Sequence, residues 1–561
     1  MVLKAAPALA IAVLIGPILC GLGATILPAF GYFPALGGNA FSFEPWYELL
    51  ATPGLLRSCL ISLATGLITT FAALAVVAGF VAGWSHTRFF RAIQHLVSPL
   101  LSVPHAAAAF GLAFLFMPSG WLLRLFSPWL TSFERPPDLL IIHDPLGLTM
   151  MAGLFAKELP FLMLVTLAAM PQANPRPLSM VATGLGYGRM AGFLLTVWPS
   201  IYPQIRLAVF AVIAYASSVV DVALILGPTN PAPLSVRLVS WMNDPDLMVR
   251  FKASAGAVLQ LGITAACLII WILGERLFSR VIAQIRDSGR RFDHDKAVRM
   301  LFSTVLTATA CMVFSGLALL AIWSFSGFWP FPNAFPNELT LDNWQRQLPA
   351  LGQPLATTFA IGLCATLLAL VLTLGCLERE ARTGRTGGNR ALALIYIPLI
   401  VPQASFVFGL QLFFLSVGIN ASLFALILVH LVFVLPYVFL SLSDSWRAWD
   451  GRYAQVARTL GASRNSVFWQ IRAPMLLRPI LVASAVGFAV SVGQYLPTLL
   501  VGAGRWPTIT TEAVALASSG DRRVIGVYAF IQMILPFIGF AAATIIPALV
   551  FMRRRDMRAG S

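Results

Sequence analysis

Residue types that catalyse reactions or bind metals are present in this chain, but not at the spacings that such chemistry requires. The six cysteines lie inside or at the ends of apolar runs and form no CxxC pair, which argues against disulfides and a cysteine metal site. The four lysines precede alanine or glutamate, whereas a Walker A loop requires serine or threonine after its lysine. We therefore predict no catalytic centre, metal or nucleotide cofactor in this chain, and we do not expect it to be an enzyme.

Three charged residues lie within long apolar runs: Lys157, Glu158 and Asp221. Charges inside a bilayer are costly and often belong to a transport path. Lys157 and Glu158 are neighbours, about 100° apart around a helix, so they cannot face each other. We expect one of them to pair with Asp221. A structural ion pair between helices and a role in a solute path are both open interpretations.

The corresponding region later in the chain, 491–497, is polar but uncharged and includes Gln494 and Tyr495. Together with the three charged residues, these two form the translocation path that we predict, lined unequally by the two parts of the chain. His105 and Gln403 each follow a proline at matched positions. We expect each of these two to be a satisfied polar residue of the core.

The composition indicates that membrane helices position these residues. Of the 561 residues, 58% are hydrophobic and only 11% are charged, and the mean hydropathy is +0.83. A soluble domain is about 45 to 50% apolar and about a quarter charged, so a soluble enzyme is excluded. The apolar runs predict an all-α polytopic membrane protein with twelve spans. They fall near 7–29, 58–84, 93–116, 146–170, 204–227, 254–276, 301–326, 353–377, 391–416, 421–442, 479–502 and 524–551.

The basic residues predict how the spans are oriented. The net charge is +16, and placing the N-terminus in the cytoplasm puts 27 of the 38 lysines and arginines on that side and ten on the other. The positive-inside rule then predicts that both termini are cytoplasmic. Because the basic residues lie between apolar runs, the charge indicates topology and attraction to the lipid bilayer, and we expect no nucleic-acid partner.

A charged segment at 278–299 divides the chain into two repeats. It carries too many charges to cross a bilayer, so we predict a cytoplasmic linker between a first repeat at 1–277 and a second at 300–561. Each repeat has six spans, an even number. Both repeats therefore enter the membrane in the same sense.

Two stretches are repeated between the halves. In the third span of each, Val103-Pro104 and Phe110-Gly111-Leu112 match Val401-Pro402 and Phe408-Gly409-Leu410 at an offset of 298. After the fourth span, 180–199 aligns without gaps with 455–474 and shares seven of 20 residues. We call these two segments the first and second motif loops. Gly186 and Gly461 would let each loop turn between two short helices, and Pro199 and Pro474 would lie near the start of the next membrane helix.

The motif loops resemble the EAA motif of ABC importer permeases, which reads Glu-Ala-Ala, three residues, Gly, nine residues and Ile-x-Leu-Pro. The second motif loop matches at Gln455, Val456, Ala457, Gly461, Ile471 and Pro474. The first has Met180, Val181 and Ala182 in the opening positions, followed by Gly186 and Pro199. Both loops lack the usual glutamate. Arg189 and Arg464, equivalent in the two loops, are candidates for replacement polar contacts or else arginines on a solvated face.

The resemblance covers nearly the whole chain and is closest to double-length inner-membrane permeases such as those for ferric iron and thiamine. It implies a permease subunit of an ATP-driven importer, in which each motif loop holds a coupling helix that docks on an ATPase. It also implies two separate ATPase subunits that bind ATP and magnesium, a solute-binding protein on the outer side, and a bacterial inner membrane. It does not identify the cargo.

A secondary active transporter of the major-facilitator type is the alternative, because it also has twelve spans in two parallel halves. Such transporters typically carry a charged, glycine-rich loop after the second span. Here that loop reads SHTRFFR at 85–91, and the repeated motif follows the fourth span instead. This placement favours the importer permease.

Overall fold

The computed structural model of the chain describes residues 2–385, 387–518 and 520–551. Within these ranges the regular structure is helical, apart from two isolated β-bridges, Phe33–Gly38 and Ser326–Leu339. Ten helices are long and apolar enough to cross a bilayer, and the number is twelve when each of two bent helix pairs counts as one span. The predicted all-α polytopic fold is therefore confirmed.

The helices follow the chain in two sets. Those of the first repeat are α1 Val2–Ala29, α2 Glu44–Leu50, α3 Leu55–Trp84, α4 Arg88–Val97, α5 His105–Phe116, α6 Trp121–Phe126, α7 Leu148–Ala169, α8 Pro175–Gly184, α9 Arg189–Thr196, α10 Trp198–Ser218, α11 Asp221–Leu226, α12 Leu234–Met242 and α13 Val249–Asp287. Those of the second repeat are α14 Lys296–Phe325, α15 Asp342–Thr383, α16 Gly388–Ile400, α17 Gln403–Ser416, α18 Leu423–Arg447, α19 Arg452–Thr459, α20 Arg464–Val467, α21 Ala473–Met475, α22 Leu477–Val492, α23 Leu496–Gly502, α24 Ile509–Ala515 and α25 Arg522–Val550.

Four of the predicted spans are broken by a turn. The third and ninth break before Pro104 and Pro402, and the ninth bends by 84°. Proline has no N–H for the helix and forces the preceding residue into an extended conformation, and Val103 and Val401 are both extended. The fifth and eleventh spans break ahead of α11 and α23.

The segment between the repeats is more helical than a linker requires. α13 continues beyond the predicted boundary at 277 to Asp287, and α14 begins at Lys296, so 288–295 alone separates the two helices. The charges of this segment keep it out of the bilayer, but lysine, arginine and glutamine are good helix formers. Long helices therefore project past the apolar region.

Each repeat contributes its first helix to the other one. α1 packs on α15 and α17 of the second repeat, and α14 packs on α3 and α5 of the first. Glycines make these crossings close, as is typical where helix backbones meet in a bilayer. A Cβ atom on Gly111 of α5 would lie 2.7 Å from the carbonyl carbon of Gly316 in α14. A Cβ atom on Gly409 of α17 would lie 2.0 Å from the carbonyl oxygen of Gly21 in α1.

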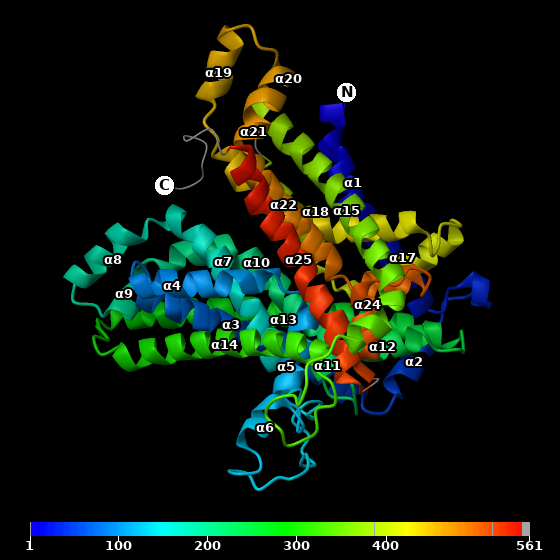
Figure 1. Cartoon of the computed structure of the whole chain (residues 1–561). Helices are drawn as coiled ribbons and strands as arrows, with labels where there is room; N and C mark the ends of the chain where they lie inside the picture. The colour runs from blue at the N-terminus through cyan, green and yellow to red at the C-terminus, as the bar shows by residue number, and fades with distance from the viewer. Residues whose placement is uncertain (1, 386, 519, 552–561) are drawn as a thin grey trace.

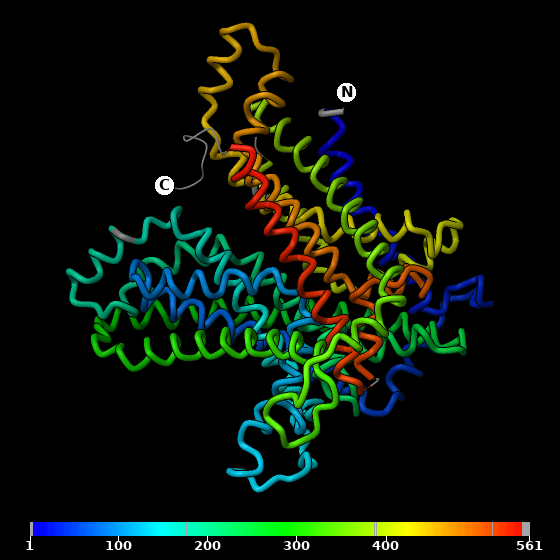
Figure 2. The backbone as a smooth tube through the Cα atoms, in the orientation of Figure 1, coloured from blue at the N-terminus to red at the C-terminus, as the bar shows by residue number. Residues whose placement is uncertain are grey.

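The two helix bundles meet near α11 and α12 and diverge toward the ends that carry α8 and α19 (Figure 1). The tube view follows the same path and shows the loops around α6 at the opposite end (Figure 2). There Arg124 joins the repeats. Its guanidinium donates hydrogen bonds to the carbonyl oxygens of Pro330 and Asn333, at 2.8 and 3.1 Å, and lies 5.1 Å from the ring centroid of Trp329. The molecule is thus tied together at the α6 end and open at the other.

Candidate functional site

The two motif loops share one backbone conformation, which begins with a short helix, α8 or α19. In the first loop, the N–H groups of Gly186 and its successor donate to the carbonyl oxygens of Thr183 and Ala182. The second loop repeats this Schellman cap at the positions 275 residues later, around Gly461. The φ angles of Gly186 and Gly461 are +82° and +87°, a left-handed conformation that residues with a Cβ atom adopt at a cost. The turns predicted at these glycines are present.

Each of these helices exposes an apolar face. In α8 and the residue after it, the face consists of Leu178, Val181 and Leu185, and the equivalents in the second loop are Tyr453, Val456 and Leu460. Val181 and Val456 are 62% and 59% exposed, whereas Ala182 and Ala457 beside them are buried. We call these two sets of three the apolar tips. The sequence reasoning included the valines but not the other four residues, although the spacing i, i+3, i+7 recurs in both copies.

The remaining motif residues lie where the loops rejoin the membrane helices. Pro199 is the second residue of α10, and Pro474 lies in α21 immediately before α22, where a missing N–H is tolerated. Ile471 is half-buried in a π-helical segment, Phe468–Arg472. Met180 and Gln455, at the position where the resembling family has glutamate, are both exposed.

The first motif loop is held by the segment between the repeats. Asp295 accepts a hydrogen bond of 2.7 Å from the backbone N–H of Met190, in the first turn of α9, and also pairs with Arg299 at 2.9 Å. The N–H of Gly188 donates to the carbonyl oxygen of Arg291 at 2.9 Å. The carboxylate at a helix N-terminus and the backbone bond fix α9 to the start of α14.

Arg189 takes part in the same anchoring. Its guanidinium donates a hydrogen bond to the carbonyl oxygen of Ser85, at the end of α3. Burial and the neighbouring Arg299 lower the pKa of the Arg189 guanidinium from its ordinary value, and Asp295 opposes this shift. Arg464, its equivalent, is exposed, and its side chain has no hydrogen-bond or ion-pair partner among the described residues.

The second motif loop is held by a buried carboxylate at the end of α15. Glu378 accepts hydrogen bonds from Arg382, at 2.6 Å, and from Arg472, at 2.9 Å. The Arg472 guanidinium also lies over the rings of Trp449 and Trp446, at 4.2 and 5.3 Å. Arg382 donates in turn to Asn465 of α20 at 3.2 Å. Charge-assisted bonds therefore connect this loop to a long membrane helix.

The charged residues of the predicted path do not pair as expected. Glu158 lies 3.3 Å from Nε2 of His105, and Lys157 donates to the carbonyl oxygens of Leu100 and Val103, at 2.9 and 2.5 Å. No ion pair joins either residue to Asp221 within the described ranges. Lys157 is instead taken up by the break in the third span, where its ammonium bonds two carbonyl oxygens of the turn that precedes Pro104.

Asp221 nevertheless belongs to the same region. It is buried at the start of α11, a helix that packs on α5, whose first residue is His105. The His105 ring also packs on Tyr215 with 4.7 Å between centroids. His105 therefore contacts Glu158 and Tyr215 and, with a side chain 34% exposed, is less enclosed than a core residue.

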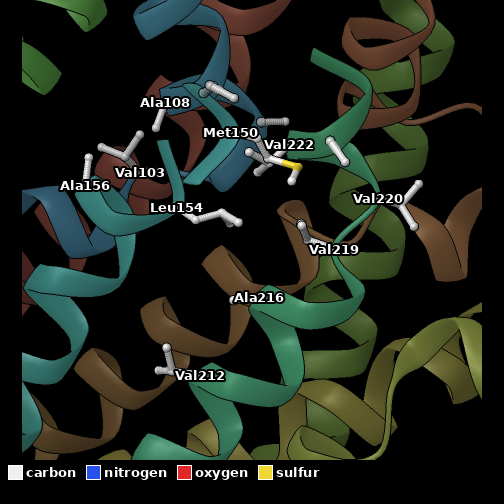
Figure 3. Close-up of a cluster of buried hydrophobic side chains, with 14 of the residues drawn as sticks. Val103, Ala108, Met150, Leu154, Ala156, Val212, Ala216, Val219, Val220 and Val222 are labelled. Carbon is white, nitrogen blue, oxygen red and sulfur yellow. The ribbon is translucent and has the colours of Figure 1, made fainter. Parts of the chain in front are cut away.

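The second repeat contributes uncharged groups to this region. Nε2 of Gln403, the first residue of α17, donates to Oε1 of Gln494 at 3.4 Å, and Tyr495 follows Gln494 at the break before α23. We call Glu158, Asp221 and His105, with Tyr215, Gln403, Gln494 and Tyr495, the polar cluster. Apolar packing surrounds it, as where Met150 of α7 lies beside Val222 (Figure 3). The described residues contain no group of three or more His, Cys, Asp or Glu side chains able to hold a metal ion.

Comparison with known proteins identifies the family. The model of binding-protein-dependent transport system inner membrane components matches residues 373–556, the half with the fuller motif. The inner membrane ABC transporter permease protein YnjC of Escherichia coli K12 is 31% identical over 92% of this chain and 93% of its own length. The chain belongs to the ABC transporter permeases.

A second relative has the same double length. The thiamine transport system permease protein ThiP of Escherichia coli K12 is 24% identical, over 81% of this chain and 82% of its own. The shorter spermidine/putrescine permease PotC of Haemophilus influenzae is 24% identical over 27% of this chain and 59% of its own. The permease described here is thus a fused, multi-pass transport subunit of an ABC importer, in a family that works with ATPase and solute-binding partners.

Proposed function

We propose that the two motif loops of this permease dock on two separate ATPase subunits at the cytoplasmic face, and that the polar cluster lines the solute path. In this arrangement both chain termini are cytoplasmic. The ATPase subunits bind ATP and magnesium, and a solute-binding protein docks at the α6 end.

The duplicated apolar tips carry this proposal. Three exposed apolar side chains recur at the same register of α8 and α19, outside the length of chain that crosses the bilayer. Burying a set of apolar side chains in a partner contributes about 25 cal/mol per Å². Two equivalent tips therefore suit two copies of one partner.

The anchors explain how force would pass from the tips to the membrane helices. Ala182 and Ala457 are buried, and Asp295 and Glu378 bond to segments that follow the two tips, α9 and Phe468–Arg472, and hold them to α14 and α15. A load on a tip therefore moves its bundle as a unit. Because the bundles diverge at this end (Figure 1), drawing the tips together closes it and changes the packing around the polar cluster.

The polar cluster suits a path because its groups come from both repeats and lie at helix breaks. His105, Asp221 and Gln403 are each the first residue of a helix that follows such a break. Irregular backbone at membrane depth is tolerated where it is enclosed by protein or lines a path. Side chains at a break can also change partners with small backbone movements. We assign Glu158, Asp221, Gln494 and Tyr495 to the path and Lys157 to the support of the break.

Val456→Ser with Leu460→Ser tests the docking. Both side chains are exposed, at 59% and 82%, so the fold should be retained. We expect weaker copurification with the ATPase subunit and a loss of permease-stimulated ATP turnover. Val298→Ser, at 44% exposure but outside both loops, is the matched control and should have no effect. Unchanged copurification of the double variant would contradict the docking.

Reconstitution tests the energy source. We expect solute uptake into proteoliposomes to require the ATPase subunits and ATP. Uptake driven by a proton or sodium gradient with the permease alone would favour the secondary transporter instead.

A further inference from the structure

The second motif loop contains a positively charged pocket, which we call the arginine pocket. It has a volume of about 120 Å³ and is open to solvent beside α19 and α20. Its lining consists of Glu378, Ala381, Arg382, Ala454, Arg458, Arg464, Val467, Phe468 and Arg472.

The charges of this pocket do not balance. Glu378 is its one acidic lining residue, and it is already bonded to Arg382 and Arg472. Arg458 and Arg464 are exposed, and neither side chain has a hydrogen-bond or ion-pair partner among the described residues. Four arginines therefore line a pocket that holds one carboxylate, and the guanidinium groups of Arg458 and Arg464 are available to a ligand.

The first motif loop lacks the equivalent set of arginines. At the positions 275 residues earlier, Thr183 stands for Arg458 and Val197 for Arg472. Arg189 stands for Arg464, but its guanidinium is bonded to the carbonyl oxygen of Ser85. The two loops thus share their apolar tips and differ in charge.

We propose that the arginine pocket receives a carboxylate side chain of the docked ATPase subunit. The inference rests on the proposed docking, because Ala454 and Arg458 belong to α19, the helix that carries the second apolar tip. Guanidinium groups match carboxylates in shape and charge, and the volume of the pocket is several times the roughly 10 to 15 Å³ that one water molecule needs on the same measure.

The arginine pocket also bears on the missing glutamate at the first position of the motif. Where the family motif has glutamate, the two loops have Met180 and Gln455, so neither supplies a negative charge to the partner. In the second loop the permease supplies positive charge instead. Two identical ATPase subunits would then bind to the two loops unequally, with an ionic contact at the second loop alone.

The test compares Arg458→Glu with Thr183→Glu, which places the same charge at the same register of the two loops. Binding of the purified ATPase subunit to the full-length permease is measured in zwitterionic lipid nanodiscs. We expect Arg458→Glu to weaken binding about tenfold or more at low salt, because repulsion replaces attraction at the partner surface. We expect Thr183→Glu to have a much smaller effect, and Arg458→Lys to retain most of the affinity.

The same binding measurement is repeated at high salt and with anionic lipid. The difference between Arg458→Glu and the wild type should shrink in about 0.5 M salt, where the Debye length is about 4 Å. An equal loss for both glutamate variants, or no loss for Arg458→Glu, overturns the proposal. A loss confined to nanodiscs with anionic lipid also overturns it, because a headgroup would then occupy the pocket.

The results distinguish a failure of the proposed docking from a failure of the proposed ionic contact. If Val456→Ser with Leu460→Ser abolishes binding and Arg458→Glu does not weaken it, the docking holds and the ionic contact is wrong. If neither variant weakens binding, both proposals are wrong.

Discussion

The close helix crossing between the repeats gives a sharp prediction for Gly409→Ala. The added Cβ atom would lie 2.0 Å from the carbonyl oxygen of Gly21, 2.3 Å from Oγ1 of Thr25 and 2.6 Å from its backbone nitrogen. Ordinary van der Waals contact with a Cβ atom begins at 3.4 Å, so α1 would have to retreat by about 1.4 Å, the difference between 3.4 and 2.0 Å. Two of the three obstructing atoms belong to a helix backbone, which cannot rotate away.

The expected cost follows from two opposing effects. Overpacking of a well-packed interface costs about 1 to 3 kcal/mol, and the displacement needed here favours the upper end. Replacing a helical glycine by alanine contributes about 0.5 to 1 kcal/mol of stability in return. We therefore expect Gly409→Ala to lower the free energy of unfolding by about 2 to 2.5 kcal/mol, which is the upper overpacking cost less the gain from alanine.

Unfolding in mixed micelles with increasing SDS, followed by circular dichroism, measures this change. Gly16→Ala on α1 is the control, because a Cβ atom there meets nothing within 4 Å, and it should be neutral or slightly stabilising. Gly111→Ala should be destabilising as well, since its Cβ atom would lie 2.7 Å from the carbonyl carbon of Gly316. Equal stability of the Gly409 and Gly16 variants would refute the close crossing of α17 and α1 at Gly409.

Three further predictions concern the site. Asp221→Asn should reduce solute uptake in the reconstituted transporter at least about tenfold while thermal stability is kept or raised, because the amide removes a charge from the membrane interior; unchanged uptake would exclude Asp221 from the path. Gly461→Ala should lower the thermal stability by about 1 kcal/mol or more and weaken ATPase binding, because φ is +87° there, whereas Gly451→Ala, where φ is −63°, should leave both unchanged. Glu378→Gln should destabilise the permease by about 3 kcal/mol, measured in the same SDS titration, because two arginines lose their carboxylate; a change below about 0.5 kcal/mol would show that the anchor is not important.

Features that depend on neighbouring residues in the chain could be predicted from the sequence. The order of the spans follows from runs of apolar residues, and the turns at Gly186 and Gly461 follow from the conformational freedom of glycine. Two of the four broken spans could also be predicted, since Pro104 and Pro402 lie inside the apolar runs at 93–116 and 391–416. Hydropathy averaged over a window does not register a single proline.

Features that depend on contacts between distant residues could not be predicted in this way. The contact of His105 with Glu158 spans 53 residues, and the bond from Arg472 to Glu378 spans 94. The expected partner of the charged pair was Asp221, because a one-dimensional reading can count charges but cannot measure the distances between them. The spacing i, i+3, i+7 shared by the two apolar tips was visible in the sequence, but the solvent exposure of their side chains was not.

The sequence by itself determined that this chain is a duplicated membrane protein with two motif loops, because the bilayer requires apolar runs of a set length and the turn requires glycine. The tertiary structure alone decided that the repeats exchange their first helices, and that Gly111 and Gly409 meet Gly316 and Gly21. It also decided which arginines are paired and which are available to a partner. These outcomes depend on contacts between helices far apart in the chain. Close packing decides which helices cross at the glycines, and the cost of burying an unpaired charge decides which arginines are paired.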